Sequence, residues 1–304
     1  MMSVIKNRSE LLFLYDVTDS NPNGDPIDEN KPRIDEETGI NFVTDVRLKR
    51  TIRDYLHDYK GKGIFILELR DEKNGMLKDK EARLKEFKDN NELIKECIDV
   101  RLFGATTAVK EKTMTLTGPV QFKYGRSLHR VNMKYVKGTT VMPSKEAKKQ
   151  GTFTERYILP YSLIAFYGIV NENAAIRQGI DLTEEDINLL LDGMWNGTKN
   201  LISNSKAGQM PRLLLRVIYK EENYHIGELD RRIEFISEKQ DEEIRDINDG
   251  KLDVTELVDA LDNNRDKILG IEYKLDDRVQ ITYDGEDARL EEILSGFDLN
   301  ELKL

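Results

Sequence analysis

The chain has 304 residues, a formal net charge of −10 and a single cysteine, Cys97. This length allows one elaborated domain, or two small ones, with a substantial core. A single cysteine excludes an internal disulfide and fits a reducing cytoplasm, and no apolar run approaches the roughly 20 residues that span a bilayer. We therefore expect a cytoplasmic protein without membrane contact, in which Cys97 is a small buried hydrophobe.

The net charge hides an uneven distribution along the chain. Residues 101–160 hold twelve Lys and Arg against three Glu, a balance of +9. Residues 221–304 hold eleven basic and 26 acidic residues, a balance of −15. Because clustering rather than the average sets a phosphate-binding surface, the middle of the chain is a candidate nucleic-acid surface. The acidic region 221–304 adds solubility, packs on the rest of the chain or meets a basic neighbour.

The first predicted strand covers residues 11–17, which are apolar on both faces and therefore expected at the centre of a sheet. Residues 21–32 are rich in Pro, Asn and Gly, a composition typical of constrained turns. A helix is expected over residues 44–59, where apolar residues recur at three- and four-residue spacing. Thr44 or Asp45 suits its N-cap.

Four basic residues flank the apolar stripe near the start of this helix: Arg47, Lys49, Arg50 and Arg53. Cations at a helix N-terminus oppose the macrodipole, at a cost of roughly 0.3–1 kcal/mol that a bound anion reverses. The helix alone leaves two alternatives open. One is a phosphate-binding surface, and the other is a solvated basic face paired with neighbouring aspartates.

Further strands are expected at residues 63–70, 113–124, 158–170 and 211–220, with an inserted helical stretch at 80–98 and a helix at 182–202. In the latter helix, Gly193 and Gly197 either weaken it or let another backbone approach closely. Without its insertions, the order is β-α-β-β-α-β. It predicts an α+β fold with a ferredoxin-like, RNA-recognition-motif-like core. That plan hosts many functions, and the usual aromatic signature for base stacking is absent in its standard form.

Residues 128–157 alternate in polarity and are basic around a turn-rich middle, which favours a projecting β-hairpin arm. Lys137 and Lys145 would lie near its tip, with Val141 and Met142 exposed there. An exposed apolar pair beside lysines suits a wedge between bases or a contact with a neighbouring subunit. The alternative is an ordinary solvated loop.

The loop at residues 203–212 supplies two further candidates, Lys206 and Arg212, for phosphate contacts. The equally good alternative is that its Ser-Asn-Ser sequence only ends the preceding helix.

Enzymatic chemistry has weaker support. The three histidines, His57, His129 and His225, lie far apart in the sequence without metal-ligand spacing. The best catalytic alternative is a cluster of aspartates around the first loop, because such carboxylates hold Mg²⁺ for phosphoryl chemistry: Asp16, Asp19, Asp25 and Asp28. Asn-Gly-Asp-Pro reads more simply as a turn. We expect no catalytic residue, metal or cofactor, with a metal-dependent ribonuclease as the alternative.

Several segments together resemble a known family. The most specific pair is NPNGDP at residues 21–26 followed by VTDVRLKRTIRDYL at 43–56; weaker matches lie at 11–17, 32–39, 99–104, 117–122 and 126–127. Over residues 8–219 the chain resembles the backbone subunit of type I CRISPR surveillance complexes (Cascade), the Cas-seven family. Its type I-B branch is the most similar.

The resemblance implies a non-catalytic subunit that polymerises along a CRISPR RNA and presents its bases for pairing with target DNA in antiviral defence. It implies one elaborated domain over residues 1–304, with a palm, a helical insertion (fingers) at 71–112, a β-hairpin thumb at 128–157 and an acidic extension at 221–304. Implied partners are the CRISPR RNA, further copies in a helical backbone, a small capping subunit, a large subunit and a guide-processing endoribonuclease. Related type III subunits cut target RNA with a loop aspartate, which is the basis of the ribonuclease alternative.

In this family the basic first helix contacts the guide backbone, which maps onto Lys49, Arg50 and Arg53. The resemblance and the charge pattern together yield the candidate RNA-binding residues: Asn23, Thr44, Arg47, Lys49, Arg50, Arg53, Arg126, Lys137, Val141, Met142, Lys145, Lys206 and Arg212.

Overall fold

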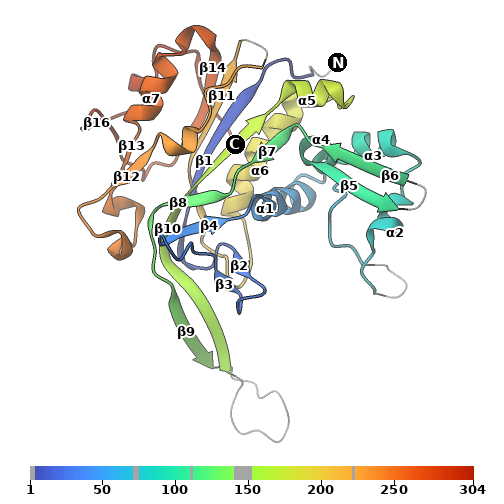
Figure 1. Ribbon diagram of the computed structural model, residues 1–304, viewed down its shortest axis with the longest axis horizontal. Helices are drawn as coiled ribbons and strands as arrows, with labels where there is room; N and C mark the ends of the chain where they lie inside the picture. The colour runs from blue at the N-terminus through green and yellow to red at the C-terminus, as the bar shows by residue number, and fades with distance from the viewer. Residues whose placement is uncertain (1–3, 71–74, 110–111, 140–152, 221–222) are drawn as a thin grey trace, which may run out of the picture.

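The computed structural model describes residues 4–70, 75–109, 112–139, 153–220 and 223–304. Its largest sheet has the strand order β17-β14-β11-β1-β10-β8-β4, with β7 and β9 also paired to β10 (Figure 1). The strands are β1 (Ser9–Ser20), β4 (Ile40–Val43), β7 (Val120–Phe122), β8 (Gly125–Arg130), β9 (Lys134–Thr139), β10 (Phe153–Val170), β11 (Met210–Tyr219), β14 (Ile268–Leu275) and β17 (Leu299–Glu301). The strands predicted at 11–17, 158–170 and 211–220 are confirmed.

Strand β1 lies between β10 and β11 and is antiparallel to both. Its side chains alternate between two hydrophobic cores, with Leu11 and Phe13 in one and Leu12 and Leu14 in the other. This double burial explains why β1 is apolar on both faces.

Two helices cover the first face of the sheet, α1 (Asp45–Asp58) and α6 (Glu184–Lys199), and both predicted helices are confirmed. A capping box formed by Thr183 and Asp186 starts α6. A Cβ on Gly193 would lie 2.9 Å from Cγ2 of Ile52, so this glycine permits the close approach of α1. A short helix, α5 (Glu172–Arg177), precedes α6.

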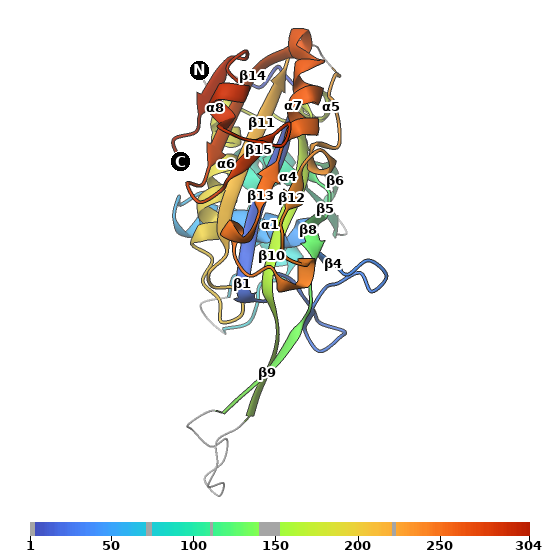
Figure 2. The same cartoon turned by 90° about the vertical axis from the view of Figure 1, so that its left-hand side faces the viewer.

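The C-terminal residues cover the opposite face of the sheet (Figure 2). Their elements are η1 (Leu229–Arg231), β12 (Glu234–Ile236), η2 (Asp241–Glu243), η3 (Ile247–Asp249), β13 (Lys251–Asp253), α7 (Thr255–Asp262), η4 (Arg265–Lys267), β15 (Ile281–Tyr283), β16 (Glu286–Ala288) and α8 (Leu290–Ile293). β12, β13, β15 and β16 form a second, small sheet. Of the alternatives for the acidic region, the structure shows packing on the sheet.

A separate group of elements lies beside α1: α2 (Lys80–Leu84), α3 (Asn90–Glu96), α4 (Ile98–Phe103), β5 (Gly104–Val109) and β6 (Lys112–Thr117). β5 and β6 form a two-stranded hairpin. This group has its own hydrophobic core, which includes Leu93 and Val100.

Two predicted strands differ from the structure. The strand predicted at 63–70 is wrong. In the described structure this segment forms isolated bridges only at Gly63 and Arg70, and the carboxylate of Asp99 accepts the N–H groups of Phe65 and Ile66. The strand predicted at 113–124 is split, because β6 pairs with β5 and β7 pairs with β10.

A two-stranded arm projects from the sheet in both views (Figures 1 and 2). β9 pairs with the first residues of β10, from Lys134 opposite Ile158 to Thr139 opposite Phe153. No helix in the part of the chain that the structure describes is long and apolar enough to cross a membrane.

Candidate nucleic-acid interface

The loop at residues 21–32 is tied to the start of α1. Asn23 Oδ1 accepts hydrogen bonds from the backbone N–H and the hydroxyl of Thr44, both at 2.9 Å. Thr44 is the N-cap residue by position, but its side chain makes no capping bond. Within the loop, β2 (Gly24–Asp25) pairs with β3 (Lys31–Pro32). Asn23 and Thr44 therefore position the helix rather than leave polar groups free.

Lys49 and Arg53 are nearly buried and pair with carboxylates inside the protein. Lys49 Nζ lies 2.9 Å from Asp45 and 3.0 Å from Gln121, and Arg53 Nε lies 2.9 Å from Asp99. Both side chains are nine-tenths buried. Carboxylates inside the protein already compensate both charges, which does not favour the expectation that these two residues contact the guide.

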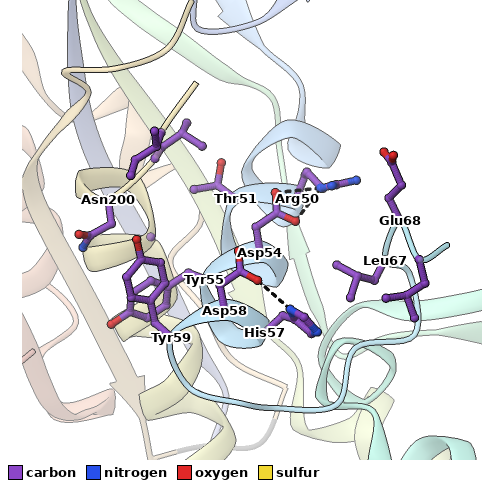
Figure 3. Close-up of a pocket in the computed structure, with 14 residues that line it drawn as sticks. Arg50, Thr51, Asp54, Tyr55, His57, Asp58, Tyr59, Leu67, Glu68 and Asn200 are labelled. Carbon is purple, nitrogen blue, oxygen red and sulfur yellow. Dashed lines mark hydrogen bonds and ion pairs between the residues drawn. The ribbon is translucent and has the colours of Figure 1, made fainter. Parts of the chain in front are cut away.

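Arg50 lies on another side of α1 and donates to both carboxylate oxygens of Asp54, at 2.7 and 2.8 Å. It borders a pocket of about 470 Å³ between α1, residues 67–69 and the end of α6 (Figure 3). Asp58 and Glu68 also line the pocket, so Arg50 faces acidic side chains rather than a surface of basic residues.

The charges of Arg47 and Lys206 interact near the loop that follows α6. Burial lowers the pKa of Lys206, and the charge of Arg47 lowers it further. Burial also lowers the pKa of Arg47, whose guanidinium donates to the Thr51 hydroxyl at 2.8 Å. Among the described residues, neither cation forms an ion pair with a carboxylate. An anion placed between them would relieve both the desolvation and the repulsion.

The same loop contains two buried polar atoms without a hydrogen-bond partner, Ser203 Oγ and Gln209 Nε2. The Lys206 ammonium finds only a long hydrogen bond, at 3.3 Å to the Ser205 hydroxyl. The loop that carries Lys206 therefore contains polar groups that the described residues leave unsatisfied.

Arg212 is an internal residue, which corrects its assignment as a phosphate ligand. Its guanidinium bonds Asp16 at 2.8 Å and Asp276 at 2.5 Å, and Tyr161 donates to Asp16 at 3.0 Å. Burial raises the pKa of Asp16, while Arg212 and the Tyr161 hydroxyl oppose that shift. This network joins β1, β10, β11 and the C-terminal residues.

Two candidates are exposed. Arg126 on β8 has its guanidinium 3.9 Å from Asp35, and Lys137 on β9 has its ammonium 3.7 Å from Glu155. Both pairs are too open to hold the cations tightly. The remaining candidates, Val141, Met142 and Lys145, lie outside the described residues.

The first-loop aspartates do not converge on one point. Asp16 pairs with Arg212, Asp25 with Arg33 at 2.8 Å and Asp28 with Lys31 at 2.6 Å. Across the described residues, no three His, Cys, Asp or Glu side chains are placed to hold a metal ion. The ribonuclease alternative therefore lacks the carboxylate cluster that motivated it.

Cys97 is buried, as predicted, and burial raises its pKa to about 12. A thiol with this pKa is almost fully protonated at neutral pH and is a poor nucleophile.

The structure adds one cation that the sequence did not single out. Arg156, at the base of the arm, donates to the carbonyl oxygen of Asn204 at 3.2 Å. It therefore lies next to the loop that carries Lys206. Arg156 lies opposite Val136 in the arm. The sequence did not single it out because the turn-rich residues between the two strands do not define which residues pair.

Comparisons with known proteins agree with the sequence resemblance. A family model described as CRISPR-associated protein Cas7 matches residues 7–255. A Haloferax volcanii protein named CRISPR-associated protein Cas7 is 34% identical, covering 97% of this chain and 96% of its own length.

Two solved structures share the fold. A chain from a "CRISPR RNA-guided surveillance complex, pre-nicking" has a TM-score of 0.56 at 13% identity, covering 95% of this chain and 98% of that chain. A chain from a "CRISPR RNA-guided surveillance complex" has a TM-score of 0.52 at 15% identity, covering 92% and 95%. The match to the family model and to the 34% identical protein shows that this chain belongs to the Cas7 (Cas-seven) family of CRISPR-associated proteins.

Proposed function

We propose that this chain is a non-catalytic, CRISPR RNA-binding backbone subunit of a type I Cascade complex, most like the I-B branch. Copies of it polymerise along the guide, hold its phosphates and leave its bases free to pair with target DNA. Membership of the Cas7 family supports this proposal, as does the fold shared with chains of RNA-guided complexes.

The observation that carries the proposal is the pair formed by Arg47 and Lys206. Like charges held together at partly buried positions destabilise each other unless an anion compensates them. The Lys206 ammonium has only a long hydrogen bond, at 3.3 Å to the Ser205 hydroxyl, so it can still bind an anion. Contacts of this kind recognise a backbone phosphate without regard to base sequence.

In this proposal the palm consists of β1, α1, β8, β10, α6 and β11, whose sheet order β11-β1-β10-β8 supports the ferredoxin-like, RNA-recognition-motif-like assignment. Residues 71–112 are the fingers and residues 128–157 the thumb. Residues 221–304 complete the single domain by covering the free face of the sheet.

The proposed partners are the CRISPR RNA, further copies of the chain, a small capping subunit, a large subunit and a guide-processing endoribonuclease. Target DNA is contacted through the guide, and the complex acts in the cytoplasm. Arg126, Lys137 and Lys145 remain proposed guide contacts, with Val141 and Met142 as the proposed wedge.

The test removes the two cations together in Arg47→Gln/Lys206→Gln. We expect weaker binding of a single-stranded guide RNA and a flatter dependence of the logarithm of the binding constant on the logarithm of salt concentration. Each lost phosphate contact reduces that slope by about 0.7, so two contacts reduce it by about 1.4. Fluorescence anisotropy at several salt concentrations measures both quantities.

The matched control is Arg289→Gln/Lys303→Gln, which changes the net charge equally at two exposed C-terminal positions. It should leave the slope unchanged. An equal slope change in both double variants would contradict the proposal, because the effect would then follow net charge rather than a site.

A further inference from the structure

The two strands at the base of the arm are not packed into a hydrophobic core. None of residues 134–138 of β9, nor residues 154–158 of β10, belongs to a hydrophobic core cluster. An isolated two-stranded ribbon is at best marginally stable in water. The direction in which the arm leaves the sheet therefore depends on contacts at its base.

The loop at residues 24–32 contacts one face of that base. The Tyr157 hydroxyl donates to Glu29 Oε2 at 2.9 Å, and Lys31 Nζ lies 5.5 Å from the centroid of the Tyr157 ring. The rings of Tyr157 and Tyr135, which are directly opposite in register, lie 5.2 Å apart. Tyr157 therefore joins both strands of the arm to the loop.

The loop at residues 203–209 contacts the other face. Neighbouring side chains on a strand point to opposite faces, so Arg156 faces away from the side on which Tyr157 lies. Arg156 donates to the carbonyl oxygen of Asn204 at 3.2 Å. The base of the arm is therefore contacted on one face by residues 24–32 and on the other by residues 203–209.

These two loops are joined to each other. The carbonyl oxygen of Ser205 accepts from the N–H of Asn21 at 2.8 Å and from the Ser20 hydroxyl at 2.9 Å. Glu29 and Asn30 have φ values of 49° and 62°, a left-handed conformation that is uncommon for residues other than glycine. A loop held in this conformation by its surroundings points to a positioning role.

We infer that Glu29, Lys31 and Asn204 form a collar that sets the direction of the arm relative to the Arg47–Lys206 pair. The collar residues position the arm and need not touch RNA. This inference rests on the proposed function for its purpose, since a fixed arm direction would set the spacing of neighbouring copies along the guide.

The test measures arm direction in the RNA-free protein. Spin labels at Lys137→Cys on β9 and Lys199→Cys at the end of α6 report one distance across the base of the arm. Native Cys97 is buried with a raised pKa and should stay unlabelled. Double electron–electron resonance then gives the distribution of that distance.

Two substitutions remove the same hydrogen bond from opposite sides. Tyr157→Phe keeps the ring, and Glu29→Asn replaces the carboxylate with a shorter, neutral amide while tolerating the positive φ. Losing one hydrogen bond should raise the population of displaced arms about two- to tenfold and broaden the distance distribution. Glu29→Asn also removes the 3.9 Å ion pair with Lys31. The double variant should therefore be no broader than Glu29→Asn alone, because Tyr157→Phe removes only the hydrogen bond that both share.

The matched controls lie in the C-terminal region. Tyr283→Phe also removes a tyrosine–carboxylate hydrogen bond, to Asp259, and Glu228→Asn also replaces an exposed glutamate at positive φ. Both should keep the parental distribution. An unchanged distribution in both collar variants would overturn the collar, as would additive broadening in the double variant.

The spin-label measurement tests the collar independently of the proposed function, because it is made without RNA. If the cation-pair variant keeps full RNA affinity while Glu29→Asn still broadens the distribution, the proposed function fails and the collar stands. If RNA binding depends on the cation pair but the arm distribution never changes, only the collar is overturned.

Discussion

Arg47 and Arg53 lie on the same helix and carry the same charge, yet their surroundings differ. Arg53 is nine-tenths buried and paired with Asp99, whereas Arg47 has no carboxylate partner among the described residues. Asp99 also accepts two backbone N–H groups from residues 65 and 66. We therefore assign Arg53 to stability and Arg47 to ligand binding.

This assignment predicts that Asp99→Ala lowers the free energy of unfolding by about 3–5 kcal/mol, because it leaves a buried guanidinium uncompensated. Urea denaturation measures the loss. The exposed Arg50–Asp54 pair supplies the control, and Asp54→Ala should cost only about 0–1 kcal/mol. Equal losses of stability in both variants would show that the buried Arg53–Asp99 pair contributes no more than an exposed ion pair.

His129 links stability to pH. Its Nε2 accepts the N–H of Leu163 at 3.3 Å and its Nδ1 donates to the Arg130 carbonyl at 2.9 Å, so the ring is bound in its neutral form. Burial lowers its pKa, although Asp241 and Glu242 partly oppose that shift.

The lowered pKa means that the unfolded chain, with a histidine pKa of about 6.5, binds the proton more readily than the folded protein. We predict that stability is fully present above pH 6.5 and is lost as the pH falls from 6.5 through the folded pKa. Urea denaturation between pH 5 and 7.5 should show a steeper loss in the parent protein than in His129→Gln. Parallel pH profiles would contradict this origin of the loss.

At the scale of secondary-structure elements, periodicity identified β1, α1, β10, α6 and β11 but failed at residues 63–70. That segment is apolar enough for a strand. Its backbone N–H groups instead bond the carboxylate of Asp99, more than 30 residues away in sequence. A local pattern cannot reveal such a distant acceptor.

The contact between α1 and α6 supports a prediction on Gly193. Replacing a helical glycine with alanine normally stabilises by about 1 kcal/mol. Here the new Cβ would lie 2.9 Å from Ile52, and overpacking costs about 1–3 kcal/mol. We expect Gly193→Ala to lower the melting temperature, while Asn188→Ala on the exposed side of α6 should not lower it. A more stable Gly193→Ala variant would show that the helices separate easily.

At the scale of the whole molecule, the acidic C-terminal residues neutralise part of the basic middle. Lys123 lies 3.2 Å from Asp230, and Arg130 lies 3.4 Å from Asp241. The balance of +9 over residues 101–160 therefore overstates the charge available to RNA. Among the described residues, neither Arg47 nor Lys206 forms an ion pair with a C-terminal carboxylate.

The C-terminal region also completes the core, since Leu12, Leu163 and Leu215 of the sheet pack against Leu257 and Leu261 of α7. We predict that a chain ending at residue 220 does not fold, because it exposes this whole apolar face. Calorimetry of the full chain should show one cooperative transition, and circular dichroism of the truncated chain should show none. A folded truncated chain would make residues 221–304 a separate domain.

The sequence by itself determined the α+β class, the central strands, the two main helices and the family, because these depend on local periodicity and on a specific run of motifs. It also identified the charged residues around the first helix. It did not decide their roles, since Lys49, Arg53 and Arg212 are paired with partners from distant segments. Only the tertiary structure brought Arg47 to Lys206 and the first loop to the arm, because burial and charge compensation depend on which segments meet in space.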